Sequence, residues 1–167
     1  MFVLVMGVTA SGKSTIGKLL GARLGVPFHD SDAYHSPESR AKMAADIPLS
    51  DEDRWPWLAR LAELAASWEI QGGAVLACSA LKQAYRDVLL QHVRAPRVVY
   101  LELSPAEAAR RLELRRGQHA IVRDFARLLA GQYRDLAPPA DALRVPAALD
   151  LEAIVEQACA YVALARA

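Results

Sequence analysis

The sequence has little of what marks disulfide-rich, membrane or nucleic-acid-binding proteins. Its 167 residues include two cysteines, Cys78 and Cys159, whose wide separation predicts neither a disulfide framework nor a metal knuckle. The formal net charge is +1 and no long basic run occurs, so binding to nucleic acid has little electrostatic support. The first apolar run, residues 2–6, is too short for a signal or membrane segment. We therefore expect a cytoplasmic protein with no nucleic-acid or membrane partner.

Apolar residues make up 53% of the chain, enough for one compact domain over residues 1–167 with a hydrophobic core. Short apolar runs predict strands at about residues 2–6, 26–30, 74–78, 97–103 and 143–145. Segments of helical periodicity predict helices at about residues 14–24, 36–45, 51–70, 79–93, 104–116, 122–136 and 149–165. This alternation predicts an α/β fold, with a parallel five-stranded sheet covered by helices on both faces. Ligands are expected at the carboxyl ends of the strands.

A phosphate-binding motif lies between the first expected strand and the first expected helix. The segment fulfils the pattern G-x-x-x-x-G-K-[ST] and, with the next residue, comprises Gly7, Val8, Thr9, Ala10, Ser11, Gly12, Lys13, Ser14 and Thr15. In such a loop, successive backbone N–H groups point at phosphate oxygens, and the helix N-terminus adds partial positive charge. We expect Lys13 to reach the β- and γ-phosphates of ATP, and the Ser14 hydroxyl to bind Mg²⁺. A glycine-rich turn without a ligand is the alternative, which the flanking strand and helix disfavour.

Two carboxylates, Asp30 and Asp32, follow the second expected strand, where both can face the phosphate loop. One suits the water shell of Mg²⁺, and the other suits acceptance of a proton from an attacking hydroxyl. The alternative is that both only cap the next turn. Because no Asp ends the strand at residues 74–78, Asp30 is the better candidate for magnesium.

Cations suited to an acidic acceptor lie farther along the chain. Lys42 and Arg54 can grip a carboxylate or a phosphate, Arg54 in bidentate fashion. The alternative for Arg54 is an ion pair with a neighbouring acid, and for Trp57 we favour packing in the core. Arg86 lies shortly after the strand at residues 74–78.

The order of these motifs resembles that of the gluconate kinase (gluconokinase) family of P-loop kinases. The matching segments are the phosphate loop, Asp30-Ser31-Asp32, His35, Lys42-Met43, Pro48-Leu49, Asp51-x-Asp53-Arg54-x-Pro56-Trp57-Leu58, Cys78-Ser79-Ala80-Leu81-Lys82, Tyr85-Arg86-Asp87, Arg115-x-Gly117, Gln132-Tyr133 and Pro138-Pro139. The resemblance spans about residues 2–140. It implies a nucleoside-kinase-like three-layer fold with a small helical lid at about residues 115–135. It also implies phosphoryl transfer from ATP to the 6-hydroxyl of D-gluconate, often in a homodimer.

The resemblance also implies residue roles. Asp32 would be the base beside the acceptor hydroxyl, and Lys13 and Arg115 would stabilise the transferring phosphoryl group. The residues lining the sugar-acid pocket would be Asp32, His35, Lys42, Arg54 and Arg86. Arg111 would stack on adenine, although a solvated helix face is the alternative for Arg111 and Arg115.

The sequence departs from the family pattern around the acceptor and in the lid. Ser36 stands where the family has Pro, Ser39 where Asn is usual, Asp46 where Gly is usual, and Ala137 where Glu is expected. Residues 117–121 read Gly-Gln-His-Ala-Ile, where the family has Gly-His-Phe-Met-Pro. The catalytic residues are intact, so a different polyhydroxy acid, or weaker specificity for gluconate, stays open.

Three other functions fit parts of the sequence. A kinase for shikimate or a nucleoside monophosphate would keep the same loop and paired aspartates, but residues 51–58 and 78–82 weigh against it. A nucleotide-binding regulatory module without turnover is disfavoured by the joint presence of Lys13, Ser14, Asp32 and Arg115. An ATPase or GTPase switch is disfavoured because no Asn-Lys-x-Asp guanine signature occurs.

Overall fold

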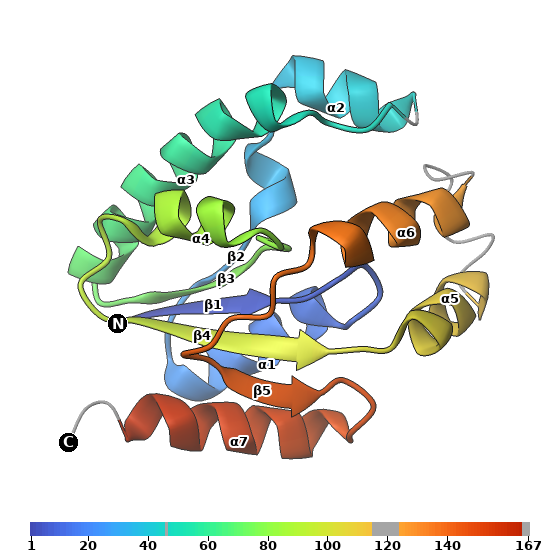
Figure 1. Ribbon diagram of the computed structural model, residues 1–167. Coiled ribbons are helices and arrows are strands. Elements are labelled where there is room, and N and C mark those ends of the chain that lie inside the picture. Colours follow the sequence, from blue (N-terminus) through green and yellow to red (C-terminus); the bar gives the residue numbers. More distant parts are fainter. Residues whose placement is uncertain (46, 115–123, 165–167) are drawn as a thin grey trace.

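A five-stranded sheet forms the centre of the molecule in the computed structural model, which describes residues 1–45, 47–114 and 124–164 (Figure 1). The strands are β1 (Phe2–Met6), β2 (Phe28–Asp30), β3 (Ala74–Ala77), β4 (Pro96–Glu102) and β5 (Leu143–Pro146). They lie in the order β2-β3-β1-β4-β5, and every pairing is parallel. The predicted parallel α/β sheet is therefore confirmed.

Helices cover both faces of this sheet. In the described residues they are α1 (Lys13–Leu24), a 3₁₀ turn (Ser31–Tyr34), α2 (Pro37–Ala44), α3 (Asp51–Ile70), α4 (Gln83–Leu90), α5 (Pro105–Leu114), α6 (Phe125–Asp135) and α7 (Leu151–Ala163). Figure 1 shows α1 and α7 on one face, α3 and α4 on the other, and α5 and α6 beyond the carboxyl end of β4. The functional loops therefore lie at the edge to which the parallel strands point.

The core explains why β1 is a continuous apolar run. All five of its residues are fully buried. Val3 and Val5 pack in the cluster that includes residues of α1 and α7, and Phe2, Leu4 and Met6 pack in the cluster that includes residues of α3 and α4. A strand with apolar contacts on both faces has no position for a polar side chain.

The largest departure from expectation lies at residues 79–82. Helix α4 begins at Gln83, not near Ser79, because Ala80 adopts a left-handed φ of +39°, which no helix accommodates and few residues with a Cβ adopt. A smaller departure concerns β2, which begins at Phe28. The Val26 N–H donates to the carbonyl of Gly21 (3.0 Å), so Val26 lies beyond α1 and caps its last turn instead of joining the strand.

Within the three described ranges, no helix combines the length and the apolar character needed to cross a membrane. Of the expected lid, residues 115–123 lie outside the described residues. The remaining part forms α6 and ends at Asp135.

Candidate active site

The phosphate loop connects β1 to α1 and has the tight curvature that its motif predicts. Gly7 and Gly12 have φ values of +150° and +94°, and Ala10 has a φ of +66°. A Cβ built on Gly7 would lie 2.7 Å from the Ser11 hydroxyl oxygen and 2.8 Å from the Leu101 carbonyl oxygen, so only glycine fits there. A cavity of about 110 Å³ lies against the loop, lined by Ala10, Gly12, Lys13, Ser14 and Thr15.

Lys13 supplies the positive charge of this loop. Its ammonium group donates a hydrogen bond to the Val8 carbonyl oxygen (2.9 Å) across the loop. Burial lowers the pKa of Lys13, and the negative charges of Asp32 and Asp30 act in the opposite direction. The two aspartates that follow β2 and the lysine of the loop are therefore close enough to interact electrostatically.

Asp30 connects the end of β2 to both the phosphate loop and the next turn. Its Oδ2 accepts a hydrogen bond from the Ser14 hydroxyl (2.6 Å), and its Oδ1 accepts one from the Asp32 backbone N–H (3.2 Å). The capping role considered for Asp30 is thus present beside its contact with the loop. The Ser14 and Asp30 oxygens are hard ligands of the kind that Mg²⁺ prefers when phosphates and waters complete its octahedron.

Asp32 and His35 lie next to each other beyond this pair. Although 75% of the Asp32 side chain is exposed, neighbouring protein desolvates its carboxylate, and this effect together with the charge of Asp30 raises the pKa of Asp32. His35 is buried, and its Nε2 lies 3.9 Å from Asp32 Oδ1. Burial lowers the pKa of His35. A largely neutral imidazole thus lies beside the candidate base.

Trp57 holds His35 in place. The two rings are stacked with centroids 4.3 Å apart and an angle of 16° between their planes, and the indole N–H donates to the Ser31 carbonyl oxygen (3.1 Å). Trp57 also packs on the apolar cluster that includes residues of α3 and α4, so the core packing favoured for it from the sequence is present. One side chain therefore connects the core to the wall of the site.

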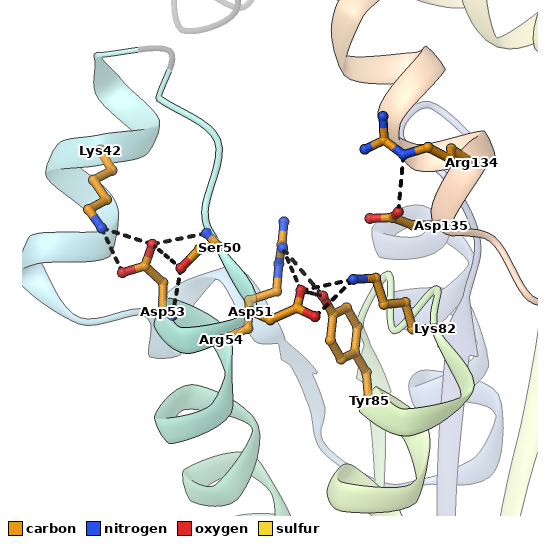
Figure 2. Close-up of polar contacts among 9 residues, drawn as sticks. All are labelled: Lys42, Ser50, Asp51, Asp53, Arg54, Lys82, Tyr85, Arg134 and Asp135. Carbon is orange, nitrogen blue, oxygen red and sulfur yellow. Dashed lines mark hydrogen bonds and ion pairs between the residues drawn. The ribbon is translucent and has the colours of Figure 1, made fainter.

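Two ion-pair groups lie at the N-terminal end of α3 (Figure 2). Lys42 contacts both carboxylate oxygens of Asp53 (2.7 and 2.8 Å). Asp51 accepts hydrogen bonds from Lys82 (2.9 and 3.0 Å) and from the Tyr85 hydroxyl, and these contacts lower its pKa. Each of the two aspartates therefore holds one lysine near the start of α3.

Arg54 is less firmly held than these lysines. Its Nη1 lies 3.8 Å from Asp51 Oδ1 and 3.4 Å from the Tyr85 hydroxyl, and its guanidinium lies over the Tyr85 ring at 5.7 Å. Its side chain is 29% exposed. The ion pair considered as the alternative for Arg54 is present but long, which leaves N–H donors for an anion.

Arg86 has a different environment. Its side chain is buried, and its two terminal nitrogens donate to the carbonyl oxygens of Ala80 (2.8 Å), Leu81 (2.9 Å) and Ala137 (2.8 Å) and to Gln83 Oε1 (2.6 Å). These four bonds use every N–H of the two terminal nitrogens. In this conformation Arg86 holds the left-handed turn after β3, and the expected contact with a sugar acid would require some of these bonds to break.

Arg111 of α5 lies beside the phosphate loop. It donates to Glu107 Oε1 (2.9 Å), to the Ala10 carbonyl oxygen (3.3 Å) and to the Ala147 carbonyl oxygen (2.7 Å). This position is compatible with contact to a nucleotide. Several expected residues lie outside the described residues: Asp46, Arg115 and the lid residues 117–121, including His119.

Two residues of the site had no role assigned from the sequence. Gln132 of α6 makes two hydrogen bonds to Thr9, and Lys82 pairs with Asp51. Both belong to segments that carry the family resemblance, Gln132-Tyr133 and Cys78–Lys82, which was the available signal. Over the described ranges, no group of three His, Cys, Asp or Glu side chains is arranged to hold a metal ion.

Comparisons with known proteins show which families this chain resembles. The shikimate kinase family model matches residues 9–135. The gluconokinase of Gluconobacter oxydans (strain 621H) is 40% identical over 141 residues, 84% of this chain and 77% of that protein. A probable gluconokinase of Mus musculus is 54% identical over 90 residues, but the match spans only 49% of its length. The crystal structure of a gluconokinase from Sinorhizobium meliloti 1021 superimposes with a TM-score of 0.85 at 39% identity, covering 98% of this chain and 91% of that one.

Proposed function

We propose that this chain, which belongs to the gluconokinase family and also matches the shikimate kinase family model, phosphorylates D-gluconate. The reaction is transfer of the γ-phosphoryl group of ATP to the 6-hydroxyl, which gives 6-phospho-D-gluconate and ADP. The observation that carries the proposal is the convergence of Lys13, the Ser14–Asp30 pair and Asp32 at one edge of the sheet.

ATP is bound by the phosphate loop, residues 7–15. Backbone N–H groups at the start of α1 donate to the phosphate oxygens, and Lys13 exchanges its bond to the Val8 carbonyl for contacts with the β- and γ-phosphates. Arg111, beside Ala10, lies where it can contact the nucleotide, and Arg115 would approach the transferring group from the lid. Positive charge around the γ-phosphoryl group is what lowers the barrier to transfer.

Ser14 and Asp30 are the residues that would hold Mg²⁺. The 2.6 Å contact between their oxygens supports this assignment, because both are hard oxygen donors and lie side by side. When bound, the ion neutralises charge on the β- and γ-phosphates.

Asp32 is the base that accepts the proton of the attacking hydroxyl. Its pKa, raised by burial and by the charge of Asp30, makes it a stronger base than an ordinary aspartate. His35 lies at the wall beside it and can hydrogen-bond a second hydroxyl of the acceptor. We place the reacting end of the sugar acid at these two residues.

The carboxylate of the sugar acid is bound by Arg54 and Lys42. Arg54 keeps free N–H donors because its ion pair to Asp51 is long, and Lys82 already neutralises Asp51. Lys42 must share its ammonium group with Asp53, so its contribution is the weaker one. Arg86 supports the pocket from behind, because it holds the turn that carries Lys82.

An ADP-release assay with Mg-ATP and a panel of acceptors tests the proposal. The panel contains D-gluconate, its epimers, shikimate and a nucleoside monophosphate. Turnover on D-gluconate well above the others supports it, and Lys13→Ala should lower that turnover at least about 100-fold. Higher turnover on another polyhydroxy acid would mean that the departures from the family pattern at Ser36, Ser39 and in the lid have changed the acceptor specificity. Shikimate as the best substrate would overturn the proposal.

We also propose where this enzyme works and in which oligomeric state. Cys78 is buried and Cys159 half-buried, and neither forms a disulfide in the described part of the chain, which fits the reducing cytoplasm. A homodimer, implied by the family resemblance, is a further part of the proposal. Sedimentation velocity of the purified chain measures it directly.

A further inference from the structure

Gln132 of α6 makes two hydrogen bonds to Thr9 of the phosphate loop. The backbone N–H of Thr9 donates to Gln132 Oε1 (2.7 Å), and Gln132 Nε2 donates to Thr9 Oγ1 (2.8 Å). The two residues are 123 positions apart in the sequence. Both contacts are partly buried, so they compete less with water than surface contacts do.

The direction of these bonds is fixed by chemistry. A backbone N–H can only donate, so the amide oxygen of Gln132 must face it, and the amide NH₂ must then face the Thr9 hydroxyl. The hydroxyl oxygen accepts that bond, which leaves its own hydrogen to be donated to a different group. Gln132 therefore presents Thr9 as a donor.

Gln132 is itself held on a well-anchored part of α6. The hydroxyl of the next residue, Tyr133, donates to the Leu103 carbonyl oxygen (2.7 Å), and Leu129 is buried. Just after the helix, the Ala137 N–H donates to the Leu81 carbonyl oxygen (2.9 Å). The amide of Gln132 is thus positioned before any ligand binds, so little conformational entropy of this side chain is lost when a nucleotide binds.

Thr9 lies at the end of the loop where the terminal phosphate of ATP is expected. The Lys13 ammonium group, which reaches the β- and γ-phosphates in loops of this type, lies 2.9 Å from the carbonyl oxygen of Val8, the residue before Thr9. A hydroxyl donor beside the residue that Lys13 contacts is a candidate donor to the γ-phosphate, a group that ADP lacks.

We infer that Thr9 donates a hydrogen bond to the γ-phosphate of ATP, and that Gln132 is the positioning residue that directs the Thr9 hydroxyl toward it. The inference rests on the ATP dependence of the proposed function and does not depend on which acid is phosphorylated. It makes α6 part of the machinery that distinguishes ATP from ADP.

Calorimetric titration with β,γ-imido-ATP and with ADP, both with Mg²⁺ and without a sugar acid, tests the inference. Thr9→Val keeps the shape and the backbone N–H of Thr9 but removes its hydroxyl. It should weaken binding of the ATP analogue about 10- to 100-fold, the range for a hydrogen bond to a charged group, and change ADP binding by less than about threefold. Gln132→Met should likewise reduce the ratio of ATP-analogue affinity to ADP affinity. The double variant should lose little more affinity for the ATP analogue than Thr9→Val alone.

Gln71→Met is the matched control. Gln71 donates to the Ser67 hydroxyl (2.7 Å) in an exposed contact at the far end of α3, so this variant should leave the ratio unchanged. An equal loss of both nucleotides in Thr9→Val or Gln132→Met would overturn the inference, because it would mean that the pair only stabilises the loop. Failure of the wild-type chain to bind either nucleotide would instead refute the proposed kinase function.

Discussion

At the residue scale, Asp32 is the side chain on which the proposed proton transfer depends. Asp32→Asn keeps the size of the side chain and the backbone bond to Asp30 but removes the basic oxygen. We expect the turnover number on the sugar acid to fall by about 10²- to 10⁴-fold, the range for loss of a general base, with ATP binding largely retained. Steady-state kinetics and calorimetry measure the two quantities separately. Turnover near the wild-type value would remove Asp32 from its role.

The stability of the same variant provides the control. Folding raises the pKa of Asp32, so the folded chain favours the protonated form, and stability is lost as the pH rises from the ordinary value of 3.8 through the raised pKa of the folded chain. At neutral pH, Asp32→Asn should therefore melt at a temperature no lower than that of the wild type. A clearly lower melting temperature would mean that lost activity reflects unfolding.

The pH dependence of turnover follows from the same shift. The base must be ionised, so kcat/KM for the sugar acid should fall as the pH decreases through the pKa of Asp32, at a pH above the ordinary aspartate value of 3.8. The residual activity of Asp32→Asn should lack this acid limb. A pH–rate profile measured with both proteins checks this, and an identical limb in the variant would assign it to another group.

At the element scale, Arg86 determines the conformation of the turn between β3 and α4. Arg86→Lys keeps a positive charge but cannot donate to the Ala80, Leu81 and Ala137 carbonyl oxygens together. We expect a loss of about 3 kcal/mol or more in the free energy of unfolding, because charge-assisted hydrogen bonds contribute about 1.5–3 kcal/mol each. Urea denaturation measures this change.

Arg144→Lys is the comparison for that experiment. Arg144 pairs with Glu102 at the surface, where both side chains are 50% exposed, so its replacement should cost less than about 1 kcal/mol. If Arg86→Lys instead unfolds like the wild type but raises KM for the sugar acid, Arg86 contacts the substrate and the positioning role is wrong.

The elements that could be predicted from the sequence are those with local signals. β1 was recognisable because a strand buried on both faces is apolar throughout, and α2 because Ser36 caps its N-terminus (the Ser39 N–H donates to its hydroxyl at 3.1 Å). The start of α4 was predicted wrongly because a left-handed alanine, Ala80, carries no turn signature. The bond between Thr9 and Gln132 could not be predicted, since no local pattern connects residues 123 positions apart.

At the scale of the whole molecule, the topology brings distant segments to one edge. β1 lies at the centre of the sheet, between β3 and β4, so the loop after it adjoins the ends of both neighbouring strands. β2 and β3 bring Asp30 and the turn around Ala80 to the same edge, and α5 and α6 cover it from the side of β4 (Figure 1). The closeness of Lys13, Ser14 and Asp30 was therefore predictable once a parallel α/β order was assumed, whereas the ion pairs of Lys42 and Lys82 depend on how helices pack.

Because the site is built from segments of the whole chain, nucleotide binding should stabilise the whole chain. At 100 times its Kd, Mg-ATP should add about 2.7 kcal/mol, which corresponds to a rise of about 5–10 °C in melting temperature for a domain of this size. Chelation of Mg²⁺ with EDTA should reduce this rise if, as proposed, Ser14 and Asp30 hold the ion that neutralises the β- and γ-phosphates. Ser14→Ala should make the rise insensitive to EDTA, while Ser67→Ala, at the other end of α3, should respond like the wild type. Differential scanning fluorimetry measures this rise for the wild type and both variants, with and without EDTA. An EDTA effect that persists in Ser14→Ala would exclude its hydroxyl as a magnesium ligand.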